Sequence, residues 1–129
     1  MKKKTIISLC LIAVVCFACF AQALAAGNNV TRGAVAFSSD MPKVAGTTNQ
    51  YNPYAIASVG RPEQISVGFT LYKVVNGKEV YVTSSSDGGY GNYFEAEAVV
   101  TLSNGTYKLY AYYTGETNTD RSTTTYIIK

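Results

Sequence analysis

Hydrophobic and polar residues alternate most regularly from residue 65 to residue 82, in two runs on either side of Asn76-Gly77. A period of two is typical of a strand with one buried face. An Asn-Gly pair between two such runs favours a two-residue turn, because both turn positions need a positive φ. The segment therefore predicts an antiparallel hairpin, and the rest of the chain is interpreted as strands laid beside it.

A two-residue turn fixes the register of this hairpin. Tyr72 then faces Tyr81 on one side of the sheet, while Leu71 faces Val82 on the other. A slip of one residue would exchange the two faces, so the turn decides which tyrosines point away from the core. The residues predicted to face the core are Ile65, Val67, Phe69, Leu71, Val80 and Val82.

Shorter alternating segments predict five more strands, at residues 30–37, 51–59, 93–102, 106–114 and 122–128. The intervening segments are predicted to be loops or turns, because Gly, Pro, Ser, Asn and Asp recur in them. They are residues 38–49, 60–63, 84–92, 103–105 and 115–121. After residue 25 no stretch has a helical period of useful length. The sequence thus predicts an all-β domain of seven antiparallel strands.

The first 25 residues have the three parts of a secretory signal peptide. Lysines occupy the start, residues 6–20 are almost entirely apolar, and residues 21–25 carry small side chains at the positions that precede a cleavage site. We expect a signal-peptide helix that is removed by cleavage after Ala25. The mature domain would then comprise residues 26–129 and be secreted, extracellular or associated with the cell envelope.

Three alternatives to cleavage after Ala25 remain open. Cleavage could follow Ala23, and residues 6–26 are just long enough to act as an uncleaved membrane anchor. Cys19 would allow a lipoprotein, although the two residues at 16 and 17 do not suit that processing site. All three cysteines of the chain lie in the apolar part of the segment, so the mature domain has no disulfide framework.

The positive charge of the chain belongs to its N-terminus. The formal net charge is +3, but removal of the three N-terminal lysines leaves eight basic residues against eight acidic ones. A neutral domain lacks the positive surface that attracts nucleic acids and anionic membranes. We therefore expect no nucleic acid and, after signal cleavage, no membrane among its partners.

The segment Leu102-Ser103-Asn104-Gly105-Thr106-Tyr107-Lys108-Leu109 resembles the corner that leads into strand F of immunoglobulin-like and fibronectin type III-like sandwiches. In those folds a tyrosine two residues before a buried position closes a hydrogen-bonded corner, and Tyr107 and Leu109 have that spacing. The resemblance implies a seven-stranded antiparallel immunoglobulin-like sandwich. The cysteine pair and the strand-C tryptophan of antibody domains are missing, so the resemblance concerns the architecture alone.

The chain is also similar to small exported proteins of Gram-positive bacteria, in which a Gly-Thr-Tyr motif and a threonine-rich pair of strands end the second half. This similarity covers about half of the chain. The motifs are not specific to one activity, and that group has no agreed activity to transfer. It implies a bacterial exported protein and nothing about its ligand.

Catalytic chemistry has little support in the mature sequence. The chain contains no histidine, and its cysteines all lie before residue 26, so a common general base, metal ligand and thiol nucleophile are absent. Glu95 and Glu97 share one strand face, whereas a glycoside hydrolase places two carboxyls on either side of a bond. The structural alternative is that both carboxylates simply lie on the solvent-exposed face of a strand. We expect no enzyme and no cofactor.

The segment from Asp87 to Asn92 offers the oxygens of those two side chains to a calcium ion. One carboxylate is few for a cation that prefers six or more oxygens. The glycines do not form a phosphate loop either, because the segment precedes a strand and has no lysine. A mobile connector is the simpler interpretation, and no metal site is predicted.

The eleven tyrosines are the most informative feature. If the strands are arranged as in the fibronectin type III-like sandwich, then Tyr72, Tyr81, Tyr110 and Tyr112 share one outward sheet face. Tyrosine combines rigid apolar area with a polar tip, which suits recognition surfaces. The structural alternative is that tyrosine is simply a good strand residue that stabilises cross-strand pairs.

We expect a non-catalytic interaction module whose candidate binding face is Tyr72, Tyr81, Tyr110 and Tyr112. Its partner would be a protein, a peptide or a cell-surface glycan, and the absence of tryptophan disfavours the glycan. A secreted antimicrobial or toxin-like polypeptide is the alternative. A neutral charge and the lack of an amphipathic helix count against membrane lysis.

Overall fold

The structure is a computed structural model that describes residues 35–129. The predicted signal peptide of residues 1–25 and the start of the first predicted strand lie outside the described residues. Within residues 35–129 no helix has the length and hydrophobicity needed to cross a membrane.

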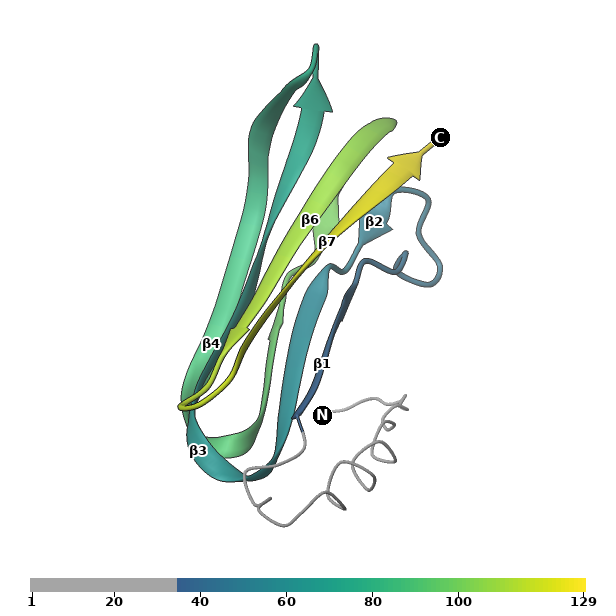
Figure 1. The fold of residues 1–129 in the computed structure, drawn as a ribbon. Helices are drawn as coiled ribbons and strands as arrows, with labels where there is room; N and C mark the ends of the chain where they lie inside the picture. The colour runs from purple at the N-terminus through teal and green to yellow at the C-terminus, as the bar shows by residue number, and fades with distance from the viewer. Residues whose placement is uncertain (1–34) are drawn as a thin grey trace.

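The described part of the chain is built from β-strands and contains no helix, which confirms the predicted all-β class. Figure 1 shows these strands as one strongly curled antiparallel sheet with a small two-stranded addition. The strands are β1 (Val35–Asp40), β2 (Gln50–Tyr51), β3 (Tyr54–Val75), β4 (Lys78–Glu97), β5 (Val100–Thr101), β6 (Gly105–Thr114) and β7 (Thr119–Ile128).

The long hairpin of β3 and β4 is the framework of the fold. The two strands pair along most of their length, with a small irregularity between Leu71 and Tyr72 and a longer interruption between Ser58 and Glu63. At this interruption the hairpin bends back on itself (Figure 1). The bend divides each strand into two halves, and each half of β3 has its own second neighbour.

The first half of β3 pairs with β1, from Tyr54 with Asp40 to Val59 with Val35. The second half pairs with β6 from Ser66 to Val74, and β6 pairs in turn with β7. The strand order is therefore β1–β3–β4 on one side of the bend and β4–β3–β6–β7 on the other. The strands β2 and β5 form a separate small sheet.

A single hydrophobic core joins both halves. Side chains that alternate along β3 and β6 point into it, and the aliphatic ones are almost completely buried. Burial of a side chain of this size contributes roughly 1.5–3 kcal/mol to stability. The buried hydrophobic residues of these two strands are Ala55, Ala57, Val59, Ile65, Val67, Phe69, Leu71, Tyr107, Leu109, Ala111 and Tyr113.

The curl brings β1 beside β7, although no ladder joins them. The Ser39 and Ser122 hydroxyls are hydrogen-bonded at 2.9 Å, and the Tyr126 hydroxyl donates to Asp40 Oδ1, also at 2.9 Å. Burial and the hydrogen bond to Asp40 raise the pKa of the Tyr126 phenol. We call these contacts the β1–β7 seam. They close one side of the curled sheet.

The predicted two-residue turn is confirmed. Asn76 and Gly77 have φ values of 52° and 79°, Val75 pairs with Lys78, and Tyr72 pairs with Tyr81. Two positive φ values are the requirement of a type I′ turn, whose twist matches that of the flanking strands.

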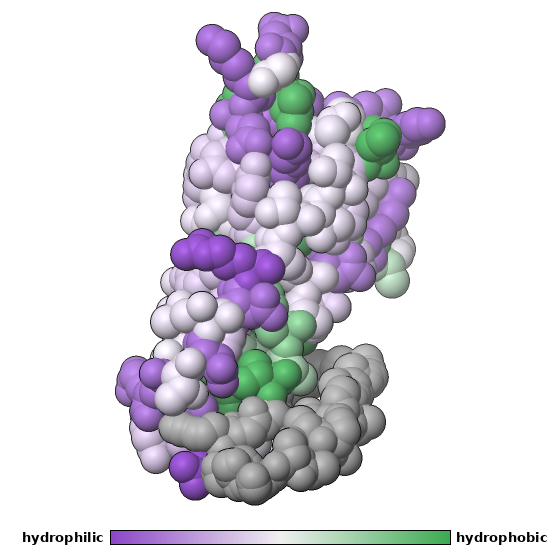
Figure 2. Space-filling view, viewed as in Figure 1, coloured by the Kyte–Doolittle hydropathy of each residue, from purple (hydrophilic) through white to green (hydrophobic). Residues whose placement is uncertain are grey.

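The predicted partner of Leu71 is wrong by one residue. Leu71 pairs with Thr83, because an irregularity after the Tyr72–Tyr81 pair leaves Val82 outside the ladder. Val82 still packs against the core, but Val80 is 50% exposed. The prediction that Val80 faces the core is wrong, because the hairpin end projects beyond the other strands (Figure 1). Figure 2 shows hydrophobic side chains reaching the surface at this end.

Two segments predicted as a turn and a loop are strand. Residues 60–63 continue β3 through its bend, and residues 84–91 pair with residues 63–70 of β3. The serines and glycines of this part of β4 have low strand propensity, but the hydrophobic strand β3 supplies a complete ladder for them. The predicted strand at residues 93–102 is instead divided between β4 and β5.

Glycine is required at position 88 of β4, where the backbone of β3 lies close by. A β-carbon built on Gly88 would lie 2.5 Å from the Ile65 carbonyl oxygen, and backbone atoms there have little room to move. The Gly-rich composition that suggested a flexible connector thus permits close strand pairing.

The predicted corner before β6 is also formed. The Tyr107 hydroxyl donates to the Ser103 carbonyl oxygen at 2.8 Å, and Tyr107 is almost completely buried. Leu109, two residues later, is fully buried. This hydrogen bond satisfies a polar atom that would otherwise be costly inside the core.

We predict that Gly88→Ala destabilises the domain by about 1–3 kcal/mol, because the added methyl group must push two backbones apart. Ser86→Ala, at an exposed position of the same strand, is the control and should change the free energy of unfolding by less than about 0.5 kcal/mol. Urea denaturation monitored by circular dichroism measures both. Equal stability of the Gly88→Ala variant and the wild type would show that this part of β4 does not pair closely with β3.

Candidate binding face

The four predicted tyrosines lie on the outward side of the sheet formed by β4, β3 and β6. We call them the tyrosine face: Tyr72, Tyr81, Tyr110 and Tyr112. Tyr72, Tyr110 and Tyr112 each adjoin a buried residue of their strand, such as Leu71 on β3 and Leu109 on β6, and Tyr81 pairs directly with Tyr72. Because successive side chains of a strand point to opposite faces, all four tyrosines lie on the side opposite the core, as the sequence predicted.

Three of these rings are in direct contact. The ring of Tyr72 lies between those of Tyr81 and Tyr110, with centroid separations of 6.4 Å and 5.6 Å and an interplanar angle of 82° in both pairs. Such edge-to-face contacts contribute about 0.5–1.5 kcal/mol each beyond the area that they bury. The three rings come from three different strands and hold one another in place.

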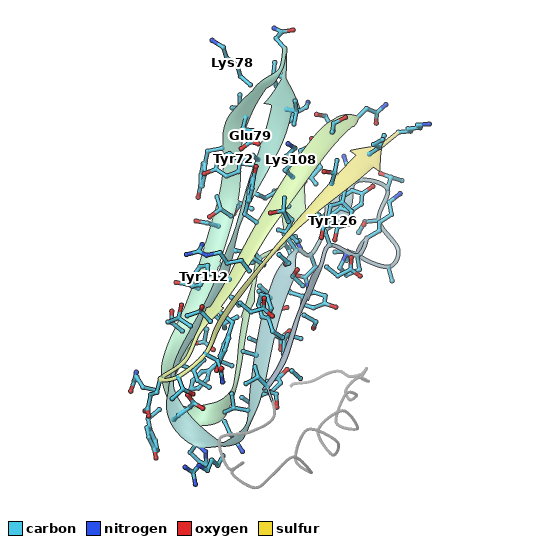
Figure 3. The ribbon with its side chains drawn as sticks, viewed as in Figure 1. Tyr72, Lys78, Glu79, Lys108, Tyr112 and Tyr126 are labelled. Atoms are coloured by element: carbon cyan, nitrogen blue, oxygen red, sulfur yellow. The ribbon has the colours of Figure 1, made fainter. Side chains whose placement is uncertain are left out.

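A carboxylate fixes one end of this cluster. Tyr110 donates its hydroxyl to Glu79 Oε2 at 2.5 Å, and Lys108 Nζ lies 3.6 Å from the same oxygen. Figure 3 shows Glu79, Tyr72 and Lys108 close together near the projecting end of the hairpin. The hydrogen bond to Glu79 raises the pKa of the Tyr110 phenol, and desolvation and the charge of Glu79 act in the same direction.

Tyr112 lies over a glycine. It pairs with Gly68 on β3, and a β-carbon built on Gly68 would lie 2.7 Å from the Tyr112 hydroxyl oxygen. Gly68 thus makes room for the ring to lie flat across the neighbouring strand. The arrangement continues the tyrosine face toward the bend, away from Glu79 (Figure 3).

Tyr81 is the most exposed member of the tyrosine face. Its side chain is 59% exposed, and its hydroxyl is hydrogen-bonded to the Ser84 hydroxyl at 3.0 Å. Tyr81 and Ser84 both belong to β4, so the face extends to the outer edge of the sheet.

The sequence identified the tyrosines but not the charged pair that holds them. Glu79 is on β4 and Lys108 on β6, the two strands that flank β3, so Glu79 reaches Tyr110 across β3. The only signal that the sequence offers is alternation, since Lys108 lies between two core residues of β6 and Glu79 precedes Val80, which the sequence predicts to face the core. Because every exposed strand face carries such charges, the signal does not distinguish Glu79 from a solvated residue.

The other candidate side chains do not converge. Glu97 accepts from Asn52 Nδ2 at 3.1 Å, while Glu95 Oε1 accepts from the Tyr93 hydroxyl at 3.2 Å. Asp87 Oδ2 accepts from the Glu95 backbone N–H at 3.4 Å, within a strand rather than a loop. Among residues 35–129 no three acidic, histidine or cysteine side chains are grouped so that they could hold a metal ion.

A cavity of about 370 Å³ lies at the bend of the hairpin, lined by Arg61, Pro62, Glu63, Tyr90 and Glu116. Its two carboxylates are engaged with backbone groups. Glu63 Oε1 accepts from the Glu116 N–H at 2.8 Å, and Glu116 Oε2 accepts from the Gln64 N–H at 2.9 Å. This reciprocal pair attaches the β6–β7 connection to the bend, which gives the buried Glu63 a structural role.

The sequence matches no protein-family model, and searches of curated proteins and of solved structures find no match.

We predict that Glu79→Gln lowers the pKa of the Tyr110 phenol toward its ordinary value of about 10, because the amide carries no negative charge. NMR titration of protein with ¹³C-labelled tyrosine rings measures this pKa. Glu97→Gln removes the same charge elsewhere and should leave the Tyr110 titration unchanged. An unchanged Tyr110 pKa in Glu79→Gln would show that the two side chains are not bonded in solution.

Proposed function

We propose that this chain is a non-catalytic interaction module that is exported and binds a protein or peptide through the tyrosine face. The observation that carries the proposal is the contact of Tyr72, Tyr81 and Tyr110, three rings from three strands, on the outward side of the sheet. Tyrosines on the interior face would need no role other than packing in the hydrophobic core. These rings instead present polar tips and ring edges to the surroundings.

The organisation of the cluster favours recognition over a purely structural role. Binding costs the entropy of ordering side chains, and this cost is reduced when the side chains are already held. Here Tyr110 is held by Glu79, and Tyr81 by Ser84. Tyrosine, together with tryptophan and arginine, is also enriched among the residues that dominate binding energies at protein interfaces.

We further propose that the fold is an immunoglobulin-like sandwich in which the two sides of the bend are the two layers. The orders β1–β3–β4 and β4–β3–β6–β7 are compatible with such layers. The hydrogen bond from Tyr107 to the Ser103 carbonyl corresponds to the tyrosine corner of those folds. Export rests on the signal-peptide pattern of residues 1–25, and the bacterial origin on the sequence resemblance.

The test is capture of partners from envelope extract and spent culture medium by immobilised protein. We predict that Tyr72→Ser/Tyr110→Ser reduces capture by about tenfold or more, the change expected when about 1.4 kcal/mol of binding free energy is lost. Quantitative mass spectrometry of the bound fraction provides the measurement.

The matched control is Tyr90→Ser/Tyr93→Ser, because these tyrosines are 73% and 54% exposed but lie outside the tyrosine face. It should capture the same partners as the wild type. Circular dichroism must show that both double variants are folded. Equal capture by a folded Tyr72→Ser/Tyr110→Ser variant would exclude the tyrosine face as the binding surface.

A further inference from the structure

The outer edge of β4 is the longest edge of the curled sheet among residues 35–129. From Lys78 to Gly91 this strand pairs with β3 on one side. No other strand of residues 35–129 pairs with its second side. At the opposite end of the same sheet, β7 is approached by β1 through the β1–β7 seam. Among the described strands, the edge of β4 is therefore the long edge that neither a ladder nor the β1–β7 seam covers.

Exposed hydrophobic side chains concentrate on this strand. Of the seven large hydrophobic residues that are exposed in the described chain, four belong to β4: Val80, Tyr81, Tyr90 and Tyr93. The segment Val80–Ser86 contains no charge, proline or glycine. Proteins usually guard long edges with lysine, proline or a bulge, and here only the irregularity at Val82 interrupts the edge.

We propose that two copies of this chain form a symmetric dimer by pairing their β4 edges. A strand that pairs with its own copy about a two-fold axis must run antiparallel, so the contact is self-complementary. Because both copies use the same edge, the contact is consumed in the pair and the assembly closes at two chains. Ser84 and Ser86, both exposed on the tyrosine-face side of β4, are small enough to let the backbones approach.

The overall charge does not oppose this association. After removal of the signal peptide, eight basic residues balance eight acidic ones, and a net charge near zero favours association of copies. The dimer would place the two tyrosine faces side by side on one continuous sheet, with both Tyr81 side chains near the axis. The inference does not depend on the proposed binding function, because sheet pairing uses backbone groups.

Sedimentation velocity over a wide range of protein concentration tests the dimer. We predict that the mass of the wild type doubles at high concentration, whereas Ser84→Lys/Ser86→Lys remains monomeric because symmetry places like charges together. Thr123→Lys/Thr125→Lys is the matched control, since it adds the same charges at exposed positions of β7, the edge at the seam. The control should dimerise like the wild type.

Mixing opposite charges makes the test specific to a symmetric contact. Ser84→Glu/Ser86→Glu should also be monomeric alone but form a mixed dimer with Ser84→Lys/Ser86→Lys. A wild type that stays monomeric at every concentration, or a mixture that forms no dimer although both variants are folded, would overturn the proposal.

Hydrogen exchange of the wild type keeps the proposal testable if these variants do not fold. Dimerisation should slow exchange of alternate amides of β4 at high concentration, because adjacent residues of a strand point their N–H groups to opposite sides. Concentration-independent exchange throughout β4 would exclude the edge as the contact.

Discussion

The antiparallel ladder between β3 and β4 is the constraint on which the rest of the structure depends. Its register starts at the Asn76-Gly77 turn and extends, with interruptions, to the pairing of Tyr54 with Glu97. Every other element of the curled sheet is attached to this hairpin, either directly through β3 or through β6. The bend between Ser58 and Glu63 then allows one continuous hairpin to supply strands to both sides of the core.

The same ladder decides what the outward face presents. Since side chains alternate, the buried position of Leu71 places Tyr72 on the outside, and the pairing with β4 places Tyr81 beside it. The irregularity at Val82 comes after this pair, so it does not disturb the pair itself. Glu79 and β6 complete the cluster by holding Tyr110 against the ring of Tyr72.

The edge strands β7 and β4 differ in what covers their outer sides. At the seam, side-chain hydrogen bonds between Ser39 and Ser122 and from Tyr126 to Asp40 join β1 to β7. Within residues 35–129, no strand pairs with the backbone donors and acceptors on the second side of β4 between Lys78 and Gly91. An exposed edge of this kind is a template for pairing with another chain.

The sequence by itself determined the all-β class, the two-residue turn, the Tyr72–Tyr81 pair and the buried alternation of β6, because these depend on local patterns. Only the tertiary structure decided that residues 84–91 are strand, that residues 60–63 bend without ending β3, and that Glu79 holds Tyr110. Serine and glycine carry little strand preference of their own, so their state depends on the strand beside them. A contact across three strands likewise depends on the order of those strands, which no local pattern contains.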